Sequence, residues 1–99
     1  MDDYITEVKG DVLTFIFQED LDTFTCMELE EGLLDLVKKH NGSVVFNMSK
    51  VEFAASSFIR LCWATASIIG QDNFSLLSLN KNIKKVFKKV GLTSVIKIR

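Results

Sequence analysis

Few side chains in this sequence are of types that do chemistry, and they are scattered along the chain. His40 is the only histidine, Cys26 and Cys62 are the only cysteines, and two adjacent serines, Ser56 and Ser57, stand between apolar segments. The cysteine spacing fits neither a disulfide framework nor a metal site, so we expect two reduced, buried thiols. The sequence contains no Gly-rich phosphate loop and no nucleophile with a nearby base. It therefore predicts no enzyme, no metal and no cofactor.

The serine pair is predicted at the start of a helix over residues 56–70. Serine side chains cap helices by accepting a bond from a backbone N–H, so either Ser56 or Ser57 suits the N-cap position. Upstream, residues 44–48 form a short apolar run that is typical of a central strand covered on both faces. The pair therefore lies where the chain passes from a strand into a helix.

The N-terminal part of the chain predicts a hairpin and a first helix. Residues 4–8 and 12–17 alternate around a Gly-containing turn, which indicates two antiparallel strands. Thr25 and Glu28 form a capping box ahead of an amphipathic run that ends at Gly42. His40 falls in the last turn of this helix, where the helix dipole favours a cation, and we assign it no catalytic role.

The C-terminal part continues the alternation of strands and helices. A strand is predicted at 74–79, Asn80 caps a third helix that ends at Gly91, and residues 95–98 form an edge strand. The order ββαβαβαβ predicts an α/β fold, a mixed sheet of about five strands with an antiparallel N-terminal hairpin and three helices. We expect residues 1–99 to form this one domain.

Charge is distributed unevenly, although the formal net charge is only −1. From Asp2 to Asp35 there are eleven acids and one base, and from Lys81 to Arg99 there are seven bases and no acid. Such polarity can steer an approaching partner over a Debye length of about 8 Å. The lysines of the third helix form either a solvated face or a surface for a membrane or an acidic partner. The neutral total argues against nucleic-acid binding.

Composition also bounds the compartment. The sequence of 99 residues is 47% hydrophobic, which suffices for a core, but its longest uncharged apolar stretch is far shorter than the roughly 20 residues of a membrane span. The chain starts with Met1, Asp2 and Asp3 instead of a basic segment followed by an apolar run, so no secretory signal is predicted. We expect a cytoplasmic protein with no membrane insertion.

Four segments together resemble the STAS domain, the fold of bacterial anti-sigma factor antagonists. Residues 49–59, with the sequence SKVEFAASSFI, resemble the family's core signature, which places two serines at the start of the second helix. Asp20-Leu21-Asp22 looks like the family's Glu-Leu-Asp, Gly70 lies near the end of the second helix, and residues 86–92 resemble the closing motif. The resemblance covers nearly the whole chain, and it depends on the order and spacing of these pieces.

The resemblance implies a partner switch. An unphosphorylated antagonist binds an anti-sigma factor or related serine kinase, which phosphorylates a serine and thereby ends the interaction. The serine that corresponds to the family's phosphate acceptor is Ser57, with Ser56 as the alternative. Added phosphate brings about −1.5 to −2 charge to a surface that must be desolvated on docking. The phosphate would end binding, and so regulate transcription, without unfolding the domain. A helix N-terminus tolerates an anion.

Three residues at this place depart from the family pattern. Ala55 stands where relatives usually have an acid, Phe58 where they have glycine, and Arg60 where they have a small residue. Phosphorylation of Ser57 and simple N-capping by Ser56 or Ser57 therefore both remain open. So does a second function, that of a constitutive, unphosphorylated STAS adaptor in a larger assembly such as a transporter complex.

The second helix is apolar over roughly 220° of its circumference, about twice an ordinary core stripe. The family resemblance implies that Ile59, Cys62 and Ala66 point inward, and we expect Trp63, at the opposite margin of the arc, in the core. The outer flank then carries Phe58, Leu61 and Ile68, which would be exposed beside Ser57 as an interaction site unless a neighbouring element buries them. The predicted docking surface combines Asp22, Ser57, Phe58, Arg60 and Leu61.

Overall fold

A computed structural model describes residues 3–99, so the first two residues of the acidic start lie outside the described part. Strands β1 (Tyr4–Lys9) and β2 (Val12–Phe17) form the predicted antiparallel hairpin. The chain continues through α1 (Thr23–Lys39), β3 (Ser43–Asn47), α2 (Ser56–Ile69), the 3₁₀ helix η1 (Gln71–Asn73), β4 (Phe74–Leu77), α3 (Lys81–Lys89), the 3₁₀ helix η2 (Leu92–Ser94) and β5 (Lys97–Ile98). The predicted order of strands and helices is confirmed.

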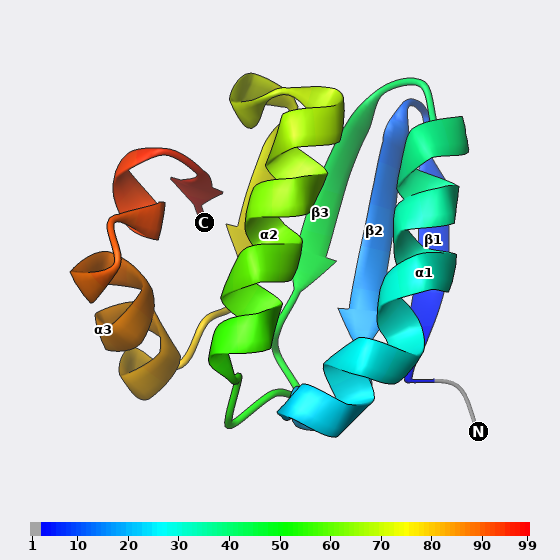
Figure 1. The fold of residues 1–99 in the computed structure, drawn as a ribbon. Helices are drawn as coiled ribbons and strands as arrows, with labels where there is room; N and C mark the ends of the chain where they lie inside the picture. Colours follow the sequence, from blue (N-terminus) through cyan, green and yellow to red (C-terminus); the bar gives the residue numbers. More distant parts are fainter. Residues whose placement is uncertain (1–2) are drawn as a thin grey trace.

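The five strands form one mixed sheet in the order β1-β2-β3-β4-β5. The first pair is antiparallel and all other pairs are parallel. The helices lie on one face of this sheet, with α1 and α3 on opposite sides of α2 (Figure 1). Because β2, β3 and β4 are parallel, the loops that lead into α1, α2 and α3 all leave the sheet at the same edge.

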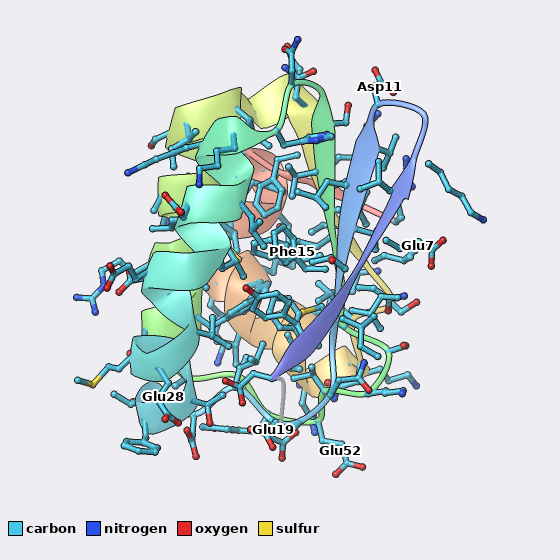
Figure 2. The ribbon with its side chains drawn as sticks, turned by 90° about the vertical axis from the view of Figure 1, so that its right-hand side faces the viewer. Glu7, Asp11, Phe15, Glu19, Glu28 and Glu52 are labelled. Atoms are coloured by element: carbon cyan, nitrogen blue, oxygen red, sulfur yellow. The ribbon has the colours of Figure 1, made fainter. Side chains whose placement is uncertain are left out.

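Aromatic rings fill the layer between the sheet and the helices. Alternate residues of the strands point to the helical side, where Phe15 lies between the two layers (Figure 2). Phe46 of the central strand contacts Phe17 at a centroid distance of 5.2 Å and Phe74 at 4.7 Å, both edge to face. Burying each such side chain contributes about 1.5–3 kcal/mol. This shared aromatic cluster joins three adjacent strands to the helices.

Two features of the fold differ from the sequence-based expectation. Helix α1 starts earlier than the predicted capping box, because Asp22 and not Thr25 is its N-cap residue. Strand β3 is central as predicted, but helices cover only one of its faces. On the other face Val45 is still buried, flanked in register by Thr14 of β2 and Ser75 of β4. Neighbouring strands therefore supply the cover that was expected from a second layer.

The remaining predictions concern the cysteines, His40, the last strand and membrane insertion. Both cysteines are free and buried. His40 Nε2 lies 2.8 Å from the carbonyl oxygen of Asp11, which joins the end of α1 to the β1–β2 turn. Strand β5 pairs with β4 as the predicted edge strand, but it covers only Lys97–Ile98 instead of 95–98, because Val95 is the C-cap residue of η2. Within residues 3–99, no helix combines the length and the apolar character that crossing a bilayer requires.

Candidate functional site

The loops at the edge where β2 and β3 end are joined into one unit. Leu21 forms an isolated parallel bridge with Ala54. Its N–H donates to the carbonyl of Phe53 at 2.9 Å, and its own carbonyl accepts from the N–H of Ala55 at 2.8 Å. Since Leu21 is fully buried, this bridge is a fixed point of the fold. It brings the first turn of α1 beside the first turn of α2.

Two polar side chains hold the segment before the serines in place. Asp20 Oδ1 accepts from the backbone N–H groups of Glu52 at 2.8 Å and Phe53 at 3.1 Å. From the other side, Asn80 Nδ2 donates to the carbonyls of Val51 at 3.3 Å and Glu52 at 3.1 Å. Asn80 also caps α3, because its Oδ1 accepts from the N–H of Ile83 at 2.8 Å. The loop into α2 is thus fixed by residues from both neighbouring loops.

The serine pair lies in the first turn of α2, but neither serine caps the helix. The N-cap residue is Ala55, which has no side-chain oxygen to offer, so the expectation of a serine cap is wrong. The bond between Ala55 and Leu21 fixes the start of the helix one residue earlier than a serine cap requires. Ser56 is exposed and Ser57 is partly buried. The first turn of α2 consequently lacks a stabilising side-chain cap.

The Ser57 hydroxyl points inward. Its oxygen is buried and has no hydrogen-bond partner of ordinary geometry. The thiol of Cys26 in α1 is its polar neighbour and donates to the carbonyl of Leu21, with the sulfur 3.7 Å from the oxygen. Burial raises the pKa of this thiol, and a polar contact with the Ser57 hydroxyl, which falls short of a hydrogen bond, offsets part of the rise. Ser57 therefore lies at the contact between α1 and α2.

Asp22, which was predicted in the docking surface, is exposed and has a structural role of its own. Its Oδ1 accepts from the backbone N–H of Thr25 at 2.8 Å and so caps α1. This bond and the Thr25 hydroxyl lower the pKa of Asp22 from its ordinary value of 3.8, against the raising effect of burial. A carboxylate at this place also interacts favourably with the positive end of the helix dipole.

We expect the Asp22→Asn variant to lose part of the pH dependence of stability while keeping the cap. A lowered pKa in the folded state stabilises the fold at pH values above 3.8, and this stabilisation is lost as the pH falls through the folded-state value. Urea unfolding at about pH 7 and about pH 3 should therefore show wild type and variant converging at the lower pH. Equal differences at both pH values would contradict this role, and Asp22→Ala should be less stable than Asp22→Asn at both.

Two residues predicted in the docking surface, Phe58 and Leu61, are buried instead. Their exposed fractions are 0% and 1%. The Phe58 ring is covered from two elements, because Phe87 of α3 stacks on it at a centroid distance of 6.2 Å and Phe17 of β2 contacts it at 5.4 Å. The wide apolar arc of α2 thus packs against the sheet, α1 and α3 together. Neither side chain is accessible to a partner in this structure.

The rest of α2 divides between core and surface. Ile59, Cys62 and Ala66 are buried as predicted. Ile68 is exposed as predicted. Trp63, which was expected in the core, is exposed as well. Arg60 is exposed in the turn that follows the serines, so its side chain remains available for a partner.

The accessible apolar surface beside the serine turn comes from residues that the sequence did not single out. Phe24 is 68% exposed, Met27 69% and Phe53 54%. We call these three residues the apolar trio. Phe24 and Met27 lie in the first turns of α1, shortly after Leu21, and Phe53 accepts the backbone bond from Leu21, so all three come from the segments that the bridge joins. Large apolar side chains exposed on neighbouring segments favour an interaction site.

Exposed carboxylates come from the same segments as the apolar trio and form what we call the acidic end. It consists of Glu19, Asp20, Asp22, Glu28 and Glu52, all exposed. Figure 2 shows Glu19, Glu28 and Glu52 at the same end of the molecule. A hydrogen bond with Asp3, followed by burial and the charges of Asp3, Asp22 and Glu28, raises the pKa of Glu19. This crowding of like charges arises from loops that are distant in sequence. Within residues 3–99, no group of three or more His, Cys, Asp or Glu could hold a metal ion.

Comparisons with known proteins agree with this architecture. A family model for the STAS domain matches residues 3–99. An anti-sigma-factor antagonist (STAS) domain protein from Planctomyces limnophilus has a TM-score of 0.88 at 21% identity, covering 100% of this chain and 90% of that chain. An anti-sigma factor antagonist from Mycobacterium paratuberculosis has a TM-score of 0.85 at 20% identity, covering 96% and 82%. Identities at this level establish the fold alone.

Two further structures are of one antagonist in two states. Unphosphorylated SpoIIAA has a TM-score of 0.80 at 15% identity, covering 97% of this chain and 87% of that chain. The phosphorylated form of SpoIIAA, described as a Bacillus cell fate determinant, has a TM-score of 0.72 at 15% identity, covering 97% and 90%. The comparison with curated protein sequences gives no match.

Proposed function

Because this chain belongs to the STAS domain family, we propose that it is a non-enzymatic regulatory module that works in the bacterial cytoplasm by docking another protein. The partner is an anti-sigma factor or a related serine kinase. Docking occurs at the edge where the loops into α1 and α2 meet. The single observation that carries this proposal is the exposed apolar trio beside the serine turn.

The apolar trio has the character of an interface centre. Phe24, Met27 and Phe53 are each more than half exposed, although large apolar side chains of this kind are usually buried. Aromatic residues and Met are enriched at the centres of protein interfaces, and charged residues form the rim. Here the rim is supplied by Asp22, Arg60 and the other carboxylates of the acidic end.

Phosphorylation at the serine turn is the regulatory part of the proposal. Ser57 is the acceptor by position in the family motif, and Ser56 is the alternative because its side chain is exposed. The similar fold of SpoIIAA, whose phosphorylated form is among the solved structures, supports a fold that tolerates phosphate. A phosphate beside the apolar trio would raise the cost of desolvating this surface and weaken docking.

A constitutive adaptor is the second candidate function, and one observation favours it. The Ser57 oxygen is buried, so a kinase has no access to it unless the first turn of α2 opens. Ala55 and Phe58, which depart from the family pattern, flank the serine pair. In this case docking at the apolar trio would be permanent, for example within a transporter complex, and no cofactor would be needed.

The test is an affinity measurement on the apolar trio. We expect the Phe24→Ala/Phe53→Ala variant to bind the anti-sigma factor of the source organism about 100-fold more weakly, from roughly 1.4 kcal/mol for each lost anchor. Isothermal titration calorimetry with the purified partner measures the change. The matched control is Ile68→Ala, which removes an exposed apolar side chain near the opposite end of α2. Equal affinities of the wild type and the double variant would show that the trio is not part of the interface.

A further inference from the structure

Helix α3, whose inner side packs on α2, carries a second charged surface on its outer side. Its outward side consists of Lys81, Lys84, Lys85, Lys88 and Lys89, which we call the lysine face, all exposed. The inward side consists of Ile83 and Phe87, which are buried. The ion pairs among residues 3–99 join Lys9 to Glu7 and Lys39 to Asp35, so none of them involves α3. Five like charges on a helix of nine residues thus have no opposite charge paired with them.

Apolar side chains adjoin the lysine face as well. Val86 is 46% exposed and Val90 49%. They are one helical turn apart and lie between the buried stripe and Lys89 on the helix surface. The lysine face with these valines therefore combines positive charge and accessible apolar area, as the acidic end and the apolar trio combine negative charge and apolar area.

We infer that the lysine face of one copy of this chain docks on the acidic end of a second copy. Five ammonium groups face five carboxylates, Val86 and Val90 meet the apolar trio, and no ion pair within residues 3–99 joins either set to an opposite charge. Within residues 3–99 no ion pair joins the two surfaces, although Glu52 lies near the start of α3, and the remaining carboxylates of the acidic end belong to α1 and the loop before it, across α2 from α3 (Figure 1). The contact is therefore head to tail, and it leaves a free surface at each end of the assembly.

Charge favours a second copy over an anionic membrane as the occupant of the lysine face. The formal net charge of −1 means that two copies repel each other only weakly at a distance. When the lysine face of one copy is turned toward the acidic end of another, their local charges attract. A membrane surface would attract the lysine face but repel the acidic end of the same small domain. Attraction between copies should be strong at low salt and screened within about 3 Å at 1 M salt.

The experiment uses two variants that each lose one surface. Lys84→Glu/Lys88→Glu removes most of the net positive charge of the lysine face. Glu28→Lys/Glu52→Lys removes most of the net negative charge of the acidic end without changing Asp20, Asp22 or the apolar trio. Sedimentation velocity of the wild type should show assemblies that grow with protein concentration at low salt and dissociate at high salt. Each variant alone should remain a monomer, and an equimolar mixture should form a 1:1 dimer, because one intact surface remains on each partner.

Three outcomes would overturn the inference. The first is a wild type that stays monomeric at low salt, and the second is a mixture of folded variants that does not associate. The third is a monomeric wild type that co-sediments with phosphatidylserine vesicles through α3, which assigns the lysine face to a membrane. Far-UV circular dichroism of both variants verifies their fold. No anti-sigma factor enters these measurements, so their failure is distinct from a failure of the proposed function.

Discussion

Phe58→Ala should cost about 3–5 kcal/mol of unfolding free energy, a large part of the total stability of a domain of this size. The Phe58 ring is fully buried and contacts rings from three different elements. Phe46 of β3 lies at 5.7 Å, Phe17 of β2 at 5.4 Å and Phe87 of α3 at 6.2 Å. Removing the ring leaves a cavity that cannot close, because sheet and helices would have to move together.

Urea denaturation followed by circular dichroism measures this loss. Ile68→Ala is the matched control on the same helix, and it should cost only about 1 kcal/mol, because the Ile68 side chain is 38% exposed and loses less buried area. The Phe58→Ala/Phe87→Ala double variant should cost less than the sum of the single variants, because the two rings share one contact. A loss at Phe58 of under about 1 kcal/mol would contradict the packing of α3 on α2.

The burial of Phe58 also explains why the sequence alone misplaced the docking surface. The apolar arc of α2 is wide enough for three neighbours, and periodicity measures the width of an arc without identifying what covers it. The covering residue, Phe87, lies in a helix that follows another strand. Only the path of the chain after β4, fixed by the contacts of Asn80 with the loop of Val51 and Glu52, brings α3 onto this flank.

The apolar trio was missed for a more local reason. Placing the cap at Thr25 left Phe24 outside the predicted helix, so its relation to Met27 was not apparent. With Asp22 as the cap, Phe24 and Met27 belong to α1 and lie three residues apart on a side away from its buried stripe. Two large apolar residues on the side of a helix opposite its core stripe were therefore the signal in the sequence that could have indicated this surface. Phe53 could not be assigned in this way, because the bridge between Leu21 and Ala54 joins two separate loops.

Most of the fold was predictable because its determinants are local. The hairpin follows from alternation around Gly10, and α3 from the Asn80 cap and its stripe of Ile83 and Phe87. Parallel pairing then follows from helices that connect consecutive strands. By contrast, the functional edge is assembled from three loops, and its hydrogen bonds involve Asp20 and Asn80, whose partners lie far away in sequence.

Ser57→Ala should abolish phosphorylation by the kinase partner, whereas Ser56→Ala should leave it intact. The Ser57 oxygen must first become accessible, and two features make this opening easy. The hydroxyl has no hydrogen bond to break, and the first turn of α2 has no side-chain cap to hold it. Local opening of a helix end requires far less free energy than global unfolding. Intact mass and fragment spectra after incubation with ATP and the kinase identify the modified serine.

The missing cap gives this prediction a quantitative control. Ala55 has the extended backbone of an N-cap residue, with φ −76° and ψ 167°, so Ala55→Ser should add a cap worth about 1 kcal/mol. If Ser57 is phosphorylated from the opened turn, the initial rate should then fall about fivefold, since 1 kcal/mol corresponds to that factor in the open population. An unchanged rate with a more stable helix would mean that the kinase reaches Ser57 without opening the turn.

Phosphorylated Ser57 should also weaken docking strongly, by 100-fold or about 2.8 kcal/mol if the interface desolvates the phosphate. The Ser57 oxygen is buried beside Cys26, so a phosphorylated side chain must turn outward to reach solvent, at the edge that carries the carboxylates of the acidic end. Both the desolvation of a dianion and the like charges oppose binding there. Calorimetry with the phosphoprotein and the partner measures the change, with the unmodified Ser57→Ala variant binding as wild type. Phosphorylation of Ser56 alone would keep the switch but place it on the alternative acceptor. Phosphorylation of neither serine would instead favour the constitutive adaptor, because then the buried Ser57 hydroxyl contributes only to the contact between α1 and α2.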